Sequence, residues 1–169
     1  MSNKRKISPY LNGYTLVNDG KYKEALELAN SYLYFDKKWY QSGRDIKAYC
    51  LFKMGKHEES FDILDKRLLF DPKDYLALSL KANRLSLIWR HREATKLANK
   101  FIRIAKKDSR SWKLYEAYWI KALVLYHKWE YKQSIRYYRE SLKSKPLNRS
   151  IKSNAKIWIE RCKSELKSI

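Results

Sequence analysis

Glycine, proline and cysteine are scarce in this 169-residue chain, which contains four, three and two of them. Because no stretch is rich in Gly, Ser or Pro, no flexible linker divides the sequence, and we expect a single domain over residues 1–169. No run approaches 18 uninterrupted apolar residues, and the basic N-terminus precedes no apolar segment typical of a secretory signal. Cys50 and Cys162 lie in predicted helices without a Cys or His neighbour at metal-binding spacing. We therefore expect a reduced, cytoplasmic protein, although the first eighteen residues lack an acid, which leaves import into an organelle open.

What the chain does contain is a ten-residue motif that occurs four times. Each copy opens with a leucine and closes with a small residue, and the copies span 16–25, 51–60, 85–94 and 125–134. The leucines are therefore separated by 35, 34 and 40 residues. Self-similarity at a period of about 20–50 residues is typical of stacked structural repeats, which usually serve as binding surfaces.

Small residues recur at two fixed positions of this pattern. The first lies three residues before the leucine and holds Gly13, Ala48, Ala82 and Ala122. The second closes the motif and holds Ala25, Ser60, Ala94 and Ser134. Because a residue without bulk lets two backbones approach closely, each copy predicts a helix, a tight turn and a second helix that touch at the small residues.

The pattern resembles the tetratricopeptide repeat, a unit of about 34 residues with small and large apolar residues at such positions and a closing proline. Pro72 and Pro146 fall just beyond the predicted second helix in two of the units. The resemblance implies an all-α, right-handed superhelical solenoid of four helix-turn-helix repeats, at about residues 6–40, 41–74, 75–114 and 115–148. Residues 149–168 lack the motif but keep apolar residues at helical spacing, so we expect a capping helix there.

Six extra residues separate the third and fourth copies, around residues 107–113. They could form a longer loop or a longer first helix of repeat 4, capped by Asp108, Ser109 or Ser111. Aromatic residues follow at helical spacing from Trp112 to Trp119. We therefore expect the longer helix.

Motifs that would indicate catalysis are missing from the sequence. It has no Gly-rich phosphate loop, no nucleophile motif and no pair of metal ligands at helical spacing. His57 and His91 occupy a turn position that holds Tyr22 and Tyr131 in the other copies, so packing explains these histidines better than catalysis. We expect no enzyme activity, no cofactor and no metal.

The whole chain has a net charge of +20, and the positive charge is concentrated in its second half. Residues 1–74 contain 14 Lys and Arg against 11 Asp and Glu, whereas residues 75–169 contain 24 against 7. In the predicted second helices of repeats 3 and 4, basic residues recur every three or four positions and so share one side of each helix. This basic face consists of Arg92, Lys96, Lys100, Arg103, Lys107, Lys132, Arg136, Arg139 and Lys143. Repeat 2 has the acids Glu58, Asp62 and Asp65 at equivalent positions.

An anionic partner would explain the basic face, because like charges at this spacing weaken a helix by a few tenths of a kcal/mol per pair. The candidate partners are an acidic protein, RNA or a ribonucleoprotein, anionic lipid, and the acidic repeat 2 of another copy in head-to-tail self-association. A solvated face that only aids solubility is the alternative.

In the tetratricopeptide family the first helix of each repeat lines a concave groove, and the resemblance assigns the inward positions here. They are Tyr10, Tyr14, Val17, Asp45, Tyr49, Phe52, Ser79, Asn83, Ser86, Trp119, Leu123 and Tyr126. Tyr and Trp are favoured at binding surfaces, although some of these rings could instead pack between repeats. We expect a non-enzymatic scaffold or adaptor that binds a peptide segment in this groove and an acidic partner on the basic face. An RNA- or ribonucleoprotein-associated protein is the alternative.

Overall fold

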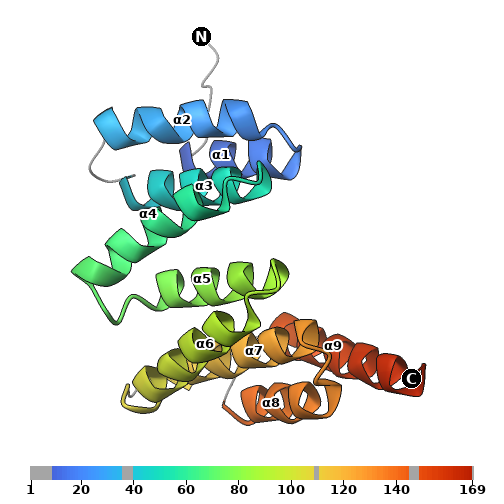
Figure 1. Cartoon of the computed structure of the whole chain (residues 1–169). Coiled ribbons are helices and arrows are strands. Elements are labelled where there is room, and N and C mark those ends of the chain that lie inside the picture. The colour runs from blue at the N-terminus through green and yellow to red at the C-terminus, as the bar shows by residue number, and fades with distance from the viewer. Residues whose placement is uncertain (1–8, 36–39, 109–110, 145–148, 169) are drawn as a thin grey trace. The chain divides into compact units, whose positions relative to one another are not determined.

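The computed structural model of the chain describes residues 9–35, 40–108, 111–144 and 149–168, and its elements there are α-helices (Figure 1). They are α1 (Pro9–Asn18), α2 (Tyr22–Phe35), α3 (Tyr40–Lys53), α4 (His57–Phe70), α5 (Tyr75–Leu87), α6 (His91–Lys106), α7 (Ser111–His127), α8 (Tyr131–Lys143) and α9 (Arg149–Lys167). Each predicted repeat corresponds to one pair of helices, and α9 corresponds to the predicted capping helix. The all-α repeat fold is confirmed.

The chain divides into two compact units, residues 1–66 and residues 67–169. In the first unit, α2 packs against α1 and α3, and α1 also contacts α3. In the second unit, α7 packs against α5, α6 and α8, and α9 packs against α8. Contacts between the first helices of successive repeats, α1 with α3 and α5 with α7, are how stacked repeats bury a continuous core. A single domain over the whole chain stays a prediction.

The small residues of the motif lie where helices touch. The Ser60 hydroxyl donates a hydrogen bond to the Ala48 carbonyl at 2.6 Å, and all atoms of both side chains are buried. Ser134 donates in the same way to the Ala122 carbonyl at 2.8 Å. At Gly13, an added Cβ atom would collide with the side chain of Ile46 in α3. The predicted contact between the two helices at the small residues is confirmed in repeats 2 and 4, whereas Gly13 makes room for a side chain of the next repeat.

The turn inside each motif is a helix C-cap closed by two backbone hydrogen bonds. The carbonyl of the repeated leucine accepts from the amide five residues further on, at 2.8–3.0 Å in the four copies. The preceding amide donates to the carbonyl of the residue that follows the leucine. This pair of bonds defines the Schellman motif, in which the residue just after the helix C-terminus takes a left-handed conformation.

Glycine usually occupies that left-handed position because a Cβ atom strains it. Gly20 and Gly55 hold it in repeats 1 and 2, with φ of 76° and 79°. Trp89 and Trp129 hold it in repeats 3 and 4, with φ of 67° and 59°. Two bulky residues thus stand where the fold favours glycine.

The six extra residues between the third and fourth motifs lengthen two helices, α6 and α7, and the connection between these helices keeps its length. α6 has 16 residues where α4 has 14, and α7 has 17 where α5 has 13. Four residues separate α6 from α7, as they do α4 from α5. The predicted longer first helix is confirmed, and α6 shares the extension. Of the proposed caps, Ser109 lies outside the described residues and Ser111 is the first residue of α7.

Asp108 joins the three helices around this turn. Its carboxylate accepts hydrogen bonds from Tyr75 Oη at 2.6 Å and from Lys113 Nζ at 3.0 Å. The Lys113 side chain is only 3% exposed, and its Nζ lies 3.3 Å from the centroid of the Tyr75 ring. Because a buried ammonium needs a partner of opposite charge, Asp108 and the ring stabilise Lys113. The cluster holds together the start of α5, the end of α6 and the start of α7.

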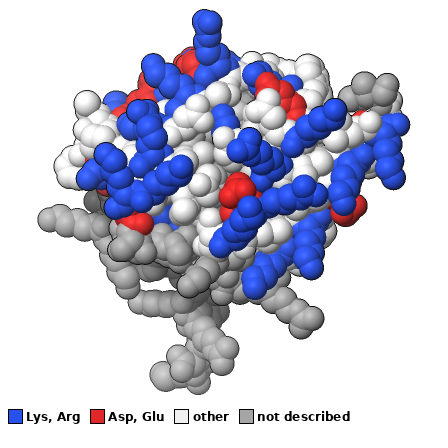
Figure 2. Space-filling view, turned by 90° about the horizontal axis from the view of Figure 1, so that it is seen from below, with Lys and Arg blue, Asp and Glu red and all other residues white. Residues whose placement is uncertain are grey.

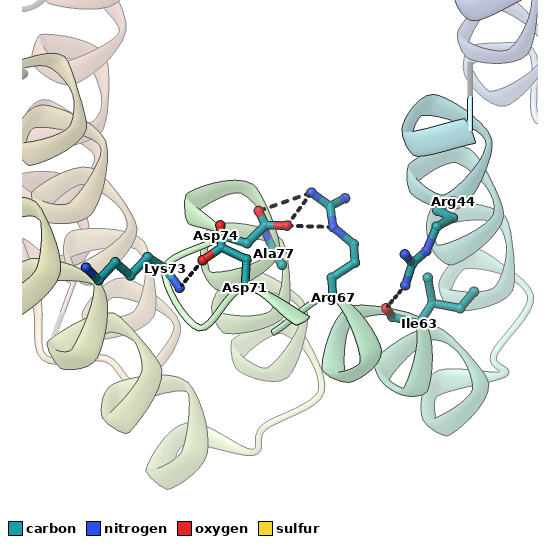
Figure 3. Close-up of polar contacts among 7 residues, drawn as sticks. All are labelled: Arg44, Ile63, Arg67, Asp71, Lys73, Asp74 and Ala77. Atoms are coloured by element: carbon teal, nitrogen blue, oxygen red, sulfur yellow. Dashed lines mark hydrogen bonds and ion pairs between the residues drawn. The ribbon is translucent and has the colours of Figure 1, made fainter. Parts of the chain in front are cut away.

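A second buried ion pair fixes the start of α5 (Figure 3). Arg67 Nε and Nη2 donate to the two carboxylate oxygens of Asp74 at 2.8 and 3.1 Å, and the Arg67 side chain is 7% exposed. Asp74 Oδ1 also accepts from the Ala77 amide at 3.0 Å and so caps the helix. One carboxylate therefore neutralises a buried guanidinium and begins α5. In the first unit, Arg44 of α3 donates to the Ile63 carbonyl of α4 at 3.3 Å.

Candidate interaction surfaces

The predicted basic face lies on α6 and α8 of the second unit. Both helices are amphipathic, because Ala98 and Phe101 of α6 and Ser134 and Tyr138 of α8 are buried on the opposite side. Eight of the nine predicted basic residues are exposed, and Lys100 is half-buried. Figure 2 shows Lys and Arg side chains spread over the visible surface, with few Asp and Glu between them.

Two hollows flank the cationic side of α6. The first has a volume of about 720 Å³ and is lined chiefly by Lys73, Lys100, Arg103, Lys106 and Lys107. The second has a volume of about 440 Å³ and lies among α6, α7 and α8. Arg103 and Lys106 line both hollows. The predicted face did not include Lys73, which precedes α5, or Lys106, which lies three residues after Arg103 in α6.

The second hollow combines cationic and aromatic side chains. Arg103 and Lys106 from α6 and Arg136 from α8 line it together with Tyr118 and Tyr137. The two tyrosine rings lie 6.1 Å apart between centroids. Glu140 also lines the hollow and accepts a hydrogen bond from Lys143 at 2.9 Å. Such a site suits a carboxylate or phosphate, because the guanidinium group donates in pairs to planar or tetrahedral oxyanions.

The predicted groove residues are buried or half-buried in their own units. Val17 and Asp45 are 5% and 8% exposed, and Ser79 and Ser86 are also buried. The half-buried members are Tyr14, Tyr49, Phe52, Asn83, Trp119, Leu123 and Tyr126. The side chain of Tyr10 lies outside the described residues. Among the described members, the half-buried ones therefore are those that present surface to a partner.

Aromatic members of the predicted groove also take part in packing. The Phe52 ring lies 4.8 Å from the His57 ring, between centroids. Trp119 meets the buried Tyr138 edge-on at 5.1 Å, and Tyr126 meets Trp158 of α9 at 5.1 Å. Each of these rings therefore has a packing role, and peptide binding by the groove stays a prediction.

The histidines pack against aromatic rings or polar groups. His57 contacts Phe52, and His91 lies 5.6 Å from the Trp89 ring, between centroids, as the packing interpretation predicts. His127 Nδ1 lies 2.9 Å from the Ser86 hydroxyl. Burial, and next the proximity of His91, lower the pKa of His127, so its imidazole is neutral at neutral pH.

Trp89 and Trp129 are the feature that sequence reasoning missed. They are 62% and 61% exposed, and their rings lie 5.0 Å apart between centroids. An alignment of the four motifs would have revealed them, because the fifth position of the motif holds Gly20, Gly55, Trp89 and Trp129. A tryptophan in a glycine position of a repeated turn is a departure that needs a reason.

Metal-ligating and membrane-spanning features are lacking among the described residues. No group of three His, Cys, Asp or Glu side chains in that part of the chain could hold a metal ion. Within the same residues, no helix combines the length and the apolar character needed to cross a bilayer. Cys50 and Cys162 are buried free thiols.

The sequence matches no protein-family model and no curated protein. Solved structures, by contrast, are similar over nearly the whole chain. A tetratricopeptide repeat protein from Parabacteroides merdae is 16% identical with a TM-score of 0.61, covering 95% of this chain and 62% of its own. MamA from Desulfovibrio magneticus RS-1 is also 16% identical, with a TM-score of 0.55, covering 94% of this chain and 90% of its own. Together with the repeated helix pairs, these similarities show that the chain has a tetratricopeptide-repeat-like fold.

Proposed function

We propose that the protein is a non-enzymatic interaction scaffold that binds an acidic protein segment on the basic face of α6 and α8. The observation that supports this proposal is the second hollow, where Arg103, Lys106 and Arg136 from two helices converge beside Tyr118 and Tyr137. Three cations carried by two helices can bind a carboxylate-bearing segment at several points. The repeat-like fold supports a binding role, since stacked repeats usually present binding surfaces.

An acidic protein suits this surface better than RNA does. Proteins that bind single-stranded RNA stack bases on aromatic rings as well as contacting phosphates. Tyr118 and Tyr137, which line the hollow, are half-buried, and their rings contact each other. Little ring surface is therefore offered to a base, whereas the cations remain available to side-chain carboxylates. RNA binding is the second candidate, supported by the excess of 24 Lys and Arg over 7 Asp and Glu in residues 75–169.

A salt titration separates the two partners. We would follow the fluorescence anisotropy of a labelled peptide rich in Glu and Asp, and of a labelled single-stranded RNA, against the purified chain. The proposal predicts that the peptide binds at least as tightly as the RNA near physiological salt. Tighter binding of RNA, with log K falling against log salt by about 0.7 per phosphate contact, would favour the RNA-associated alternative.

The predicted groove supplies a second binding surface for an extended peptide segment. Tyr14 and Tyr49 of the first unit are half-buried and pack against its core. Replacing both with alanine is expected to reduce capture of a groove-bound partner while circular dichroism shows unchanged helicity. Unchanged capture would remove the groove from the proposal and leave the basic face.

A further inference from the structure

A small pocket of about 270 Å³ opens beside the two turns that carry Trp89 and Trp129. The two tryptophans line it together with Tyr126, Tyr131, His127, Glu165, Ser86 and Leu87. All these residues belong to the second unit. Four of these eight lining residues are Trp or Tyr, and one carries a carboxylate.

The tryptophans occupy strained backbone positions that folding alone does not explain. Both have positive φ at a turn position where repeats 1 and 2 have glycine, and a side chain there adds strain. Both are more than half exposed, so their rings bury little surface in return. Their rings do contact each other, at 5.0 Å between centroids. Residues that are strained, apolar and exposed together point to a binding role rather than a packing role.

The electrostatics of the pocket are opposite to those of the chain. Among its described lining residues none is Lys or Arg, although the chain has 38 Lys and Arg against 18 Asp and Glu. Glu165 Oε1 accepts a hydrogen bond from Tyr126 Oη at 3.4 Å, which orients the carboxylate. Burial raises the pKa of Tyr126 and of Tyr131, so both phenols are neutral at neutral pH. The neutral His127 adds no positive charge.

We propose that this pocket binds an alkylammonium cation, the methylated lysine side chain of a partner protein. The faces of Trp and Tyr rings attract cations, and quaternary ammonium groups are recognised by aromatic cages. Methyl groups suit the apolar walls, whereas the ammonium of an unmodified lysine is strongly hydrated. The volume lies below the range of about 300–1,000 Å³ that drug-sized ligands need, so it suits one side-chain head group.

This inference goes beyond the proposed function, because the basic face attracts anions and this pocket attracts a cation. The pocket shares Ser86 and Tyr126 with the predicted groove but requires no peptide along the groove. Arg161, outside the lining, has its guanidinium carbon 5.8 Å from the Tyr126 ring centroid and 5.2 Å from that of Trp158. The chain's own cation thus already contacts one ring of the pocket.

The test is an NMR titration that follows the indole N–H signals of Trp89 and Trp129. The probes are blocked trimethyl-lysine, its uncharged analogue with carbon in place of the nitrogen, and blocked unmodified lysine. We expect saturable shifts with trimethyl-lysine and at least tenfold weaker binding of the other two. Equal binding of the uncharged analogue, equal binding of unmodified lysine, or no saturable shift would each overturn the proposal.

Variants of the full chain separate binding from folding. Trp129→Gly places the favoured residue in the turn and removes one ring, so it should weaken trimethyl-lysine binding at least tenfold while the chain stays folded. Glu165→Gln should weaken it severalfold. The matched control is Glu160→Gln on the same helix, since Glu160 is exposed and pairs with Lys163 at 2.7 Å. Unchanged affinity in both test variants would contradict the site. Neutralising the basic face should leave this binding intact, so the two proposals can fail separately.

Discussion

At the scale of single residues, the second unit depends on carboxylates that serve two purposes. Asp74 pairs with the buried Arg67 and caps α5, and Asp108 pairs with the buried Lys113 and with Tyr75. The sequence identified Asp108 as a candidate cap but gave no sign of its partners. Pairings of this kind depend on which side chains are buried together, and repeat spacing does not encode that.

Asp74→Ala is expected to lower the free energy of unfolding by about 3 kcal/mol, because breaking a buried ion pair leaves the guanidinium without its carboxylate. Urea unfolding of the full chain, followed by circular dichroism, measures the change. Asp71→Ala is the control: Asp71 is exposed and accepts from the Lys73 amide at 2.9 Å, so its loss should cost about 0.5 kcal/mol. Equal effects of the two variants would contradict the role of Asp74.

The carboxyl of Glu116 is expected to make the free energy of unfolding depend on pH. Burial raises its pKa, against a hydrogen bond from Ser79 that lowers it. A carboxyl whose pKa is raised by folding stabilises the folded state below its ordinary pKa, and that contribution is lost as the pH rises through the folded-state pKa. Glu116→Gln should therefore be more stable than the parent chain at pH 7, with a smaller difference at about pH 4. The midpoints of urea unfolding of the variant and of the parent chain, measured at both pH values, test this prediction. A difference in stability between the two chains that does not grow from pH 4 to pH 7 would refute it.

At the scale of elements, the repeated motif predicts helices and turns well because the turn itself is conserved in geometry among the four copies. The leucine carbonyl closes the same hydrogen-bonded cap in each repeat, so the leucine spacing fixes where the helices end. The extension was predicted for α7 but not for α6, since a sequence insertion does not show how its residues divide between two helices. The strained tryptophans were missed because a family pattern describes what copies share.

The repeated turn can be tested by exchanging its residues. Gly55→Ala should lower the free energy of unfolding by about 1 kcal/mol, because alanine is strained at positive φ. The cost is one of backbone alone, since no atom outside the turn lies within 4 Å of the added Cβ. Trp89→Gly should leave stability unchanged or raise it. Urea unfolding measures both, and a large loss of stability in Trp89→Gly would show that the ring has a packing role.

At the scale of the whole molecule, the repeats differ in the sign of the charge on their second helices. The exposed acids Glu58, Asp62 and Asp65 lie on α4, whereas the equivalent faces of α6 and α8 are basic. Residue spacing predicted this division, because helical periodicity alone decides which side chains share a face. It could not predict that Arg103, Lys106 and Arg136 converge on one hollow, since that depends on how α6, α7 and α8 pack.

The function proposed for the basic face of α6 and α8 is the binding of an acidic protein segment. It is tested most directly by the affinity of the acidic peptide for a variant with Arg103, Lys106 and Arg136 changed to Gln. The control carries the same number of neutralised charges at Lys21, Lys23 and Lys66, which are exposed in the first unit. We predict that the variant binds at least tenfold more weakly than the parent chain and that the control stays within about twofold, since only desolvated or convergent charge contacts contribute strongly. Equal weakening in the variant and the control would show that the peptide senses only net charge and would contradict the account.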